Sequence, residues 1–182
     1  MLILASASPR RHQLLKLLVP SFEIIVPSID ERLLDNVMNP KDLSAEESRL
    51  KAYAVFSEHP NDEVLSCDTV VVLDGKPLGK PLDYNDAFRM LKKQSGKQQT
   101  VLSSYTYISQ KREITRTVSS TIVFNELTDK QIEEYIKKFQ PFDKAGSYGI
   151  QDDYPLIKEI QGSYYNVMGF PVEDLREHVF KL

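Results

Sequence analysis

Apolar residues along this chain follow two periodicities, one typical of strands and one typical of helices. Runs rich in Val, Ile, Leu, Thr and Tyr predict strands at 1–5, 22–26, 64–73, 76–78, 100–109, 113–124, 156–160 and 164–168. Apolar positions that repeat every three or four residues predict helices at 9–18, 44–58, 83–93, 128–139 and 172–180. Because hairpins alternate with helical crossovers, this order predicts an α/β or α+β fold built on a mixed sheet.

Three of the predicted helices begin with recognisable caps. Ser8 precedes a proline, which suits the first helical position because the donor that it lacks would go unpaired there. Ser44 with Glu47, and Thr128 with Gln131, form capping-box patterns in which each side chain satisfies a backbone donor of the other residue. These patterns predict helix starts at all three places.

The helix that follows Ser8 has an unusual first turn, which contains Arg10, Arg11 and His12. A helix N-terminus carries a partial positive charge and favours Asp or Glu, so each arginine costs roughly a few tenths of a kcal/mol. A bound anion would remove the conflict, and phosphate suits both backbone N–H groups and guanidinium groups. The alternative is that both arginines point into water or pair with nearby acids.

The composition narrows the class of protein. We expect one domain spanning 1–182, a length that can bury a core. The net charge of -3 argues against a broad nucleic-acid-binding surface. The single cysteine, Cys67, suits a reducing cytoplasm, and with three scattered histidines it forms no zinc set. No membrane span is expected, and the N-terminal apolar run reads as a strand rather than a signal peptide.

Some charged residues stand in unexpected places. Asp68 lies inside the run VLSCDTVVV, where a buried carboxylate needs a partner. It could face water or a salt bridge, or it could act as a metal ligand or an acid–base group in a cleft. Lys80 stands between a glycine and a proline, and Lys51 lies within the second helix. Each lysine alone is weak evidence, because most lysines are solvated.

Together, these charged residues indicate phosphoryl chemistry. The cations available for a polyphosphate are Arg10, Arg11, Lys51 and Lys80. Glu31 and Asp68 would supply oxygen ligands for Mg²⁺, which takes one or two carboxylates together with substrate phosphates and water. The sequence lacks the GxxxxGK[ST], GxGxxG and GxSxG patterns, which argues against Walker-type ATPases, Rossmann enzymes and serine hydrolases.

Two further stretches, 144–151 and 162–169, are rich in glycine and tyrosine. In the first stretch, Tyr148 could stack on a base or ribose, and Gln151 can both donate to and accept from a base edge. A structural turn around a core tyrosine explains the first stretch equally well, and the second stretch has the same ambiguity.

Seven short motifs follow one another along the chain. They are SASPRR at 6–11, DE at 30–31, RLKA at 49–52, CDTV at 67–70, GKP at 79–81, KAGSYGIQ at 144–151 and GSYYNVMGFP at 162–171. In this order they resemble the motifs of the Maf proteins, a family of nucleoside triphosphate pyrophosphatases also labelled septum formation inhibitors. The resemblance runs from residue 2 to about residue 173. One departure is Ser66-Cys67, where the family more often has Gly-Ala.

The resemblance implies an α/β fold like that of the inosine triphosphate pyrophosphatases, with a mixed central sheet that forms two lobes around a cleft. It implies hydrolysis between the α and β phosphates with a divalent metal, Mg²⁺ or Mn²⁺. The implied phosphate-binding residues are Ser8, Arg10, Arg11 and Lys51, with Lys80 as a catalytic or phosphate-binding cation. The implied catalytic and metal-handling residues are Asp68, the proton acceptor, and Glu31. Thr69 and Gln151 match the branch that acts on dTTP and UTP.

Two functions stay open on the sequence. One is a pyrophosphatase for dTTP, UTP and modified pyrimidine triphosphates. The other is a nucleotide-binding regulator of septum formation with little turnover. The set of carboxylates and lysines favours the enzyme, because binding alone does not need it. The resemblance also implies a homodimer, and neither a nucleic-acid nor a membrane partner is expected.

Overall fold

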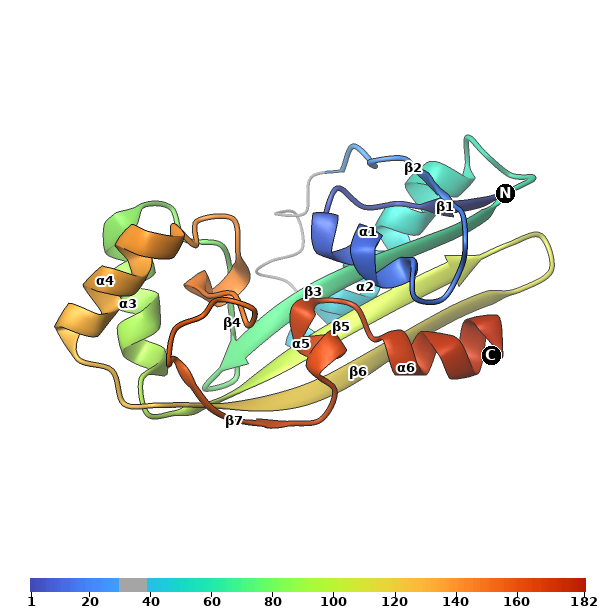
Figure 1. Cartoon of the computed structure of the whole chain (residues 1–182). Coiled ribbons are helices and arrows are strands. Elements are labelled where there is room, and N and C mark those ends of the chain that lie inside the picture. The colour runs from blue at the N-terminus through green and yellow to red at the C-terminus, as the bar shows by residue number, and fades with distance from the viewer. Residues whose placement is uncertain (30–38) are drawn as a thin grey trace.

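The computed structural model describes residues 1–29 and 39–182, and its strands form one seven-stranded sheet (Figure 1). The strands are β1 (Leu2–Leu4), β2 (Glu23–Ile24), β3 (Glu63–Leu73), β4 (Lys76–Leu78), β5 (Gln98–Ile108), β6 (Glu113–Phe124) and β7 (Ile157–Gln161). Their order is β2-β1-β3-β5-β6-β7, and β4 pairs with β3. Since β1 runs parallel to β2 and β3 while the other pairs are antiparallel, the predicted mixed sheet is confirmed.

Helices gather at the two ends of this sheet (Figure 1). The helices are α1 (Pro9–Leu15), α2 (Pro40–Phe56), α3 (Tyr84–Gln94), α4 (Asp129–Phe139), α5 (Tyr164–Met168) and α6 (Val172–Leu175), with the 3₁₀ turn η2 (Ala145–Ser147) and the π-helical turn η3 (Arg176–Phe180). Figure 1 shows α1, α2 and α6 at the end that holds both termini, and α3 with α4 at the other. The long strands β3, β5 and β6 connect the two ends.

Alternating side chains of β1 separate the two cores at the end with the termini. Leu2 and Leu4 pack with α1 and α6, whereas Ile3 and Ala5 pack with α2. Successive strand residues point to opposite faces, so α1 and α2 cover opposite faces of the sheet. A third core joins α3 and α4 to the far end of the sheet. The three cores hold the helices against the sheet, and the loops between them are available to form a functional site.

The start of α2 differs from the prediction. The capping box expected at Ser44 is wrong, because Asn39 caps the helix by accepting a bond from the backbone N–H of Asp42. Pro40 follows the cap in the first helical position, which favours this earlier start. Ser44 lies instead on the buried face of α2, where its hydroxyl meets that of Ser104 at 2.7 Å. The second predicted box, at Thr128, is confirmed.

Residues 164–168 form the short helix α5, so the strand predicted there is wrong. The hydroxyl of Ser163 accepts a bond from the N–H of Asn166 and caps the helix. Gly169 ends it with φ of 106°, a conformation that favours glycine. The local cap and the glycine stop outweigh the strand propensity of the two tyrosines.

Asp174 attaches α6 to the sheet. Its carboxylate accepts bonds from the Tyr105 hydroxyl at 2.7 Å and from Arg116 Nε and Nη2 at 2.7 and 3.1 Å. Partial burial alone would raise the pKa of Asp174, but the bonds from Arg116 and Tyr105 outweigh it and hold the pKa below its ordinary value. The ionised carboxylate therefore stabilises the folded chain.

We expect this stabilisation to depend on pH. Since the folded pKa of Asp174 is lowered, its contribution is present above the unfolded pKa of about 3.9 and is lost as pH falls through the folded pKa. Asp174→Asn should cost roughly 1–3 kcal/mol of unfolding free energy at pH 7 and less at pH 3, which lies below the unfolded pKa. Urea unfolding at both pH values checks this. Asp129→Asn, which removes an exposed partner of Lys92, is the control, and equal costs of Asp174→Asn at both pH values would contradict the prediction.

Candidate active site

A cleft of about 430 Å³ opens between the two ends of the molecule. Its walls come from the loop before α1, from α2, from β3, from the segment after β4 and from the loop that contains η2. The predicted site residues that line it are Ser8, Arg10, Arg11, Lys51, Asp68, Thr69, Lys80 and Gln151. Glu31, predicted to bind metal, lies outside the described residues. The structure thus gathers candidates from distant parts of the chain in one cleft.

Asp68 and Lys51 form a buried ion pair in this cleft. Lys51 Nζ of α2 lies 2.9 Å from Asp68 Oδ1 of β3, and the two side chains are only 10% and 8% exposed. The second carboxylate oxygen, Oδ2, is buried and has no hydrogen-bond partner among the residues that the structure describes. A buried oxygen without a partner is costly. Asp68 is therefore positioned to accept a proton or to bind a cation.

The two arginines of α1 have different surroundings. Arg11 Nε donates to the Gly169 carbonyl at 2.9 Å, and its Nη2 donates to Thr69 Oγ1 at 3.1 Å. Arg11 thus ties α1 to β3 and to the end of α5, across the floor of the cleft. Arg10 is partly buried in the cleft wall, and its charge reaches Asp143. The anion expected at this helix would therefore meet Arg10 more directly than Arg11.

Asp143 and Lys144 stand at the edge of the cleft. Lys144 Nζ lies 3.1 Å from Asp143 Oδ1. Partial burial would raise the pKa of Asp143, but Lys144 and Arg10 outweigh it and hold the pKa below its ordinary value. Lys144 and Arg10 thus bring positive charge to this edge of the cleft, which suits an anionic ligand.

Below the cleft floor, Thr69 is joined to two buried polar residues, Ser103 and Asn166, that sequence reasoning missed. Thr69 Oγ1 lies 2.9 Å from Ser103 Oγ, which donates to the Asn166 carbonyl at 3.0 Å. The buried amide of Asn166 donates in turn to the Val118 carbonyl at 3.1 Å. For Asn166, the only available sequence signal was the motif at 162–171, whose role stayed open. No sequence pattern in β5 indicated a role for Ser103.

Tyr148 is a core residue as much as a cleft residue. Its hydroxyl donates to Gln99 Oε1 at 3.1 Å, and its ring meets Phe124 edge to face with centroids 5.1 Å apart. Burial raises the pKa of Tyr148, so the phenol stays neutral. The interpretation of 144–151 as a structural turn around a core tyrosine is therefore supported for Tyr148. Lys80 and Gln151, in contrast, are exposed on the cleft wall.

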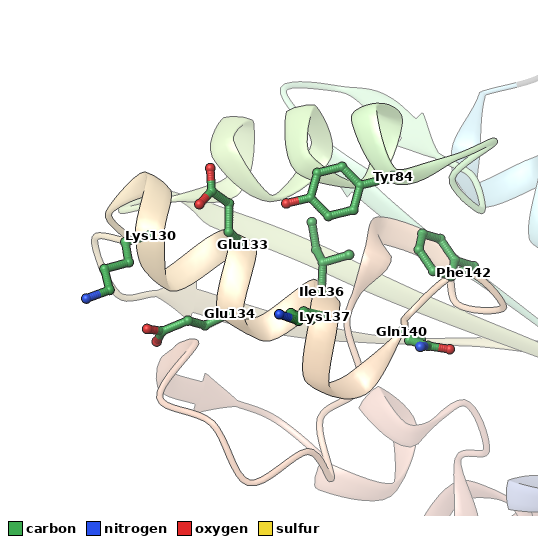
Figure 2. A pocket seen from close by; sticks show the side chains of 8 residues that line it. All are labelled: Tyr84, Lys130, Glu133, Glu134, Ile136, Lys137, Gln140 and Phe142. Atoms are coloured by element: carbon green, nitrogen blue, oxygen red, sulfur yellow. The ribbon is translucent and has the colours of Figure 1, made fainter.

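A second hollow, of about 510 Å³, lies on the outer side of α4 beside the start of α3 (Figure 2). Its lining residues are Tyr84, Lys130, Glu133, Glu134, Ile136, Lys137, Gln140 and Phe142. Figure 2 shows the ring of Tyr84 above Ile136 and that of Phe142 to the right of both, while Lys130 and Glu134 point away from these rings. No predicted site residue lies there, so the smaller cleft is the candidate active site.

The described residues partly fit a divalent cation. Among them, no three His, Cys, Asp or Glu side chains come together as a complete metal site. Asp68 Oδ2, however, is a buried carboxylate oxygen that lacks a partner in the same part of the chain. Mg²⁺ often takes one or two carboxylates and completes its shell with substrate phosphates and water. The donor set therefore suits a cation that arrives with a polyphosphate.

The comparisons with known proteins agree with this geometry. The chain matches the model of the Maf-like protein family over residues 1–182, so it belongs to that family. It is 42% identical over 186 residues to the dTTP/UTP pyrophosphatase of Thermococcus gammatolerans, covering 100% of this chain and 98% of the relative. It is 45% identical over 172 residues to the dTTP/UTP pyrophosphatase of Thermosipho africanus, covering 94% and 87%.

A solved structure is also similar. It is the nucleoside-triphosphatase, or dITP/XTP pyrophosphatase, of Mycobacterium abscessus, with a TM-score of 0.48, 12% identity and coverage of 99% of this chain and 95% of that one. Within the described residues, no helix combines the length and apolar character needed to cross a membrane.

Proposed function

We propose that this protein hydrolyses dTTP and UTP to the nucleoside monophosphate and pyrophosphate. The observation that carries the proposal is the buried carboxylate of Asp68, which pairs with Lys51 through one oxygen and has its second oxygen unsatisfied among the described residues. It lies in the same cleft as Arg10 and Lys80. The names of the curated relatives supply the reaction and the two nucleotides.

The proposed mechanism is attack of water on the α-phosphorus. Asp68 Oδ2 accepts a proton from the water, whose oxygen forms the new bond to phosphorus while the bond to the bridging oxygen of pyrophosphate breaks. Lys51 holds the carboxylate in place through Oδ1. Arg10 and Lys80 bind the phosphate oxygens and balance the charge that develops on the leaving pyrophosphate.

A divalent cation, Mg²⁺ or Mn²⁺, belongs to the proposal. Asp68 would hold it, together with Glu31, which the family resemblance adds from outside the described residues. The bound cation would supply electrostatic stabilisation of the phosphates. Both Ser8 and Arg11 lie beside the same phosphates in this proposal, with Arg11 mainly bracing the floor.

Thr69 and Gln151 are proposed to contact the base. Thr69 lies on the floor, where Arg11 Nη2 and Ser103 Oγ bond its hydroxyl. Gln151 lies on the wall formed by the loop that follows η2. A hydroxyl and an amide can together read the polar edge of a pyrimidine, since they offer both donors and acceptors.

Product analysis tests the proposal. The purified protein is incubated with dTTP, UTP, CTP, GTP or ATP and with Mg²⁺ or Mn²⁺, and the products are separated. We expect monophosphate and pyrophosphate from dTTP and UTP. Diphosphate and phosphate would show that the cleavage position is wrong. Binding without turnover of any nucleotide would favour the regulator of septum formation instead.

Two broader expectations also stay proposals. We propose a homodimer, which follows from the family resemblance, and light scattering of the purified protein would test it. We propose the cytoplasm as its location, because this sequence has a single cysteine, Cys67, which is buried and can form no intrachain disulfide.

A further inference from the structure

A tight turn carries Gln151 into the cleft. The backbone N–H of Asp152 donates to the Gly149 carbonyl at 3.1 Å, which closes a four-residue turn over 149–152. Gln151 is the third residue of this turn and is exposed on the cleft wall. Its position therefore depends on how the two ends of the turn are held.

One buried side chain of α4 holds both ends. The Tyr135 hydroxyl donates to Asp152 Oδ2 at 2.5 Å and accepts a bond from the Gly149 N–H at 2.9 Å. The side chain of Tyr135 is fully buried, and its ring packs against Phe139 and Tyr154. Because the ring cannot move freely, its hydroxyl is a fixed point between the first and last residues of the turn.

Two features show how closely the turn fits this hydroxyl. Burial and the bond to Asp152 raise the pKa of Tyr135, so the phenol keeps its proton and continues to donate at any pH used in an assay. A Cβ added at Gly149 would lie 2.8 Å from Asp152 Oδ2 and 3.0 Å from Lys144 Cε, so these side-chain ends would have to shift. A side chain at the first position of the turn would thus crowd the carboxylate that Tyr135 holds.

We propose that Tyr135 is a positioning residue that sets pyrimidine selectivity by fixing the turn that carries Gln151. This inference rests on the proposed function. A glutamine amide has a donor and an acceptor side by side. Uracil and thymine present a carbonyl where cytosine presents an amino group, so the amide distinguishes them only if its place and angle are fixed. Without the clamp, the amide can adjust to either edge.

The test compares two tyrosine hydroxyls that join α4 to the loop after η2. Tyr135 lies on α4 and bonds the turn, whereas Tyr154 lies in the loop and bonds α4. Tyr135→Phe removes the two bonds and keeps the ring. Tyr154→Phe is the matched control, since the Tyr154 hydroxyl donates to Glu134 of α4 at 3.2 Å and forms no hydrogen bond with Gly149 or Asp152. The kcat and KM values are measured for UTP and CTP, and hydrogen exchange is followed at the Gly149 amide.

We expect Tyr135→Phe to lower the ratio of kcat/KM for UTP to that for CTP by about tenfold, mainly through KM for UTP, and to speed exchange at Gly149. Tyr154→Phe should change the ratio less than twofold. In the Gln151→Ala background, Tyr135→Phe should have no further effect on the ratio, because it acts through Gln151. Unchanged selectivity together with faster exchange at Gly149 would overturn the proposal.

Two further arms keep the outcome clear. If Tyr135→Phe does not fold, Gly149→Ala, which crowds the Asp152 carboxylate, is measured instead, and unchanged selectivity together with faster exchange in the turn would show that the proposal is wrong. If the natural protein hydrolyses no nucleotide, the proposed function fails, and the ratio of dissociation constants for UTP and CTP then tests Tyr135 in the same variants. Equal ratios in Tyr135→Phe and the natural protein would overturn the inference by itself.

Discussion

Replacing Asp68 with asparagine is expected to lower kcat for dTTP by about 10²–10⁴-fold, because proton transfer by a positioned side chain contributes this much. The dissociation constant for dTTP should change only a few-fold, since the phosphates are bound mainly by cations such as Arg10 and Lys80. Single-turnover hydrolysis and equilibrium binding measure the two effects separately. Turnover within threefold of the natural protein would show that Asp68 is not the proton acceptor.

Asp68→Asn is a suitable variant because its amide has the shape of the carboxylate, and its oxygen can still accept the bond from Lys51. Its thermal unfolding should therefore show a folded protein, which separates loss of chemistry from loss of structure. Asp129→Asn is the control, since Asp129 is an exposed carboxylate of α4 that does not line the cleft. It should keep the turnover of the natural protein.

The same variant also separates the two roles proposed for Asp68. If the carboxylate serves mainly to bind the cation, a high concentration of Mn²⁺ should restore much of the activity of Asp68→Asn. If it accepts the proton, saturation with Mn²⁺ should leave kcat low. We expect the second result, because Lys51 holds Oδ1 while Oδ2 has no hydrogen-bond partner among the described residues and is left to accept a proton.

The sequence predicted most of the fold because its strongest patterns are local. The helices α3 and α4 and the strands β3, β5 and β6 lie close to their expected positions, since each has a clear period and punctuation at its ends. The failures came where short-range signals compete. Asn39 capped α2 before the more obvious box at Ser44, and the stop at Gly169 turned a tyrosine-rich segment into a helix.

The sequence predicted which residues form the candidate site, but it did not predict the contacts that each of them makes. Spacing along the chain marks Arg10 and Arg11 equally, and only the folded chain shows that Arg11 bonds Gly169, which lies near the other end of the sequence. Tyr135 keeps the helical spacing of the apolar residues in 128–139, and it is buried. Its hydroxyl, however, acts on a loop whose path no local pattern defines.

The two neighbouring arginines should therefore give different phenotypes. Arg10→Ala should raise KM for dTTP about 10–100-fold, since hydrogen bonds to charged groups contribute roughly 1.5–3 kcal/mol. Its Tm should stay within about 2 °C of the natural protein, because no hydrogen bond from Arg10 to the described residues is lost. Arg11→Ala should instead lower Tm by roughly 3–10 °C, since it removes the bonds to Gly169 and Thr69 that join α1 to the floor.

Thermal unfolding and steady-state kinetics of both variants check this contrast. Arg10→Lys is a further control, because it keeps the charge but loses the forked donors, and it should recover part of the affinity. The roles assigned to the two arginines would have to be exchanged if Arg11→Ala raised KM at an unchanged Tm while Arg10→Ala lowered Tm. The expected contrast would explain why a helix begins with two basic residues: one guanidinium secures the helix to the floor, and the other stays available for the phosphates.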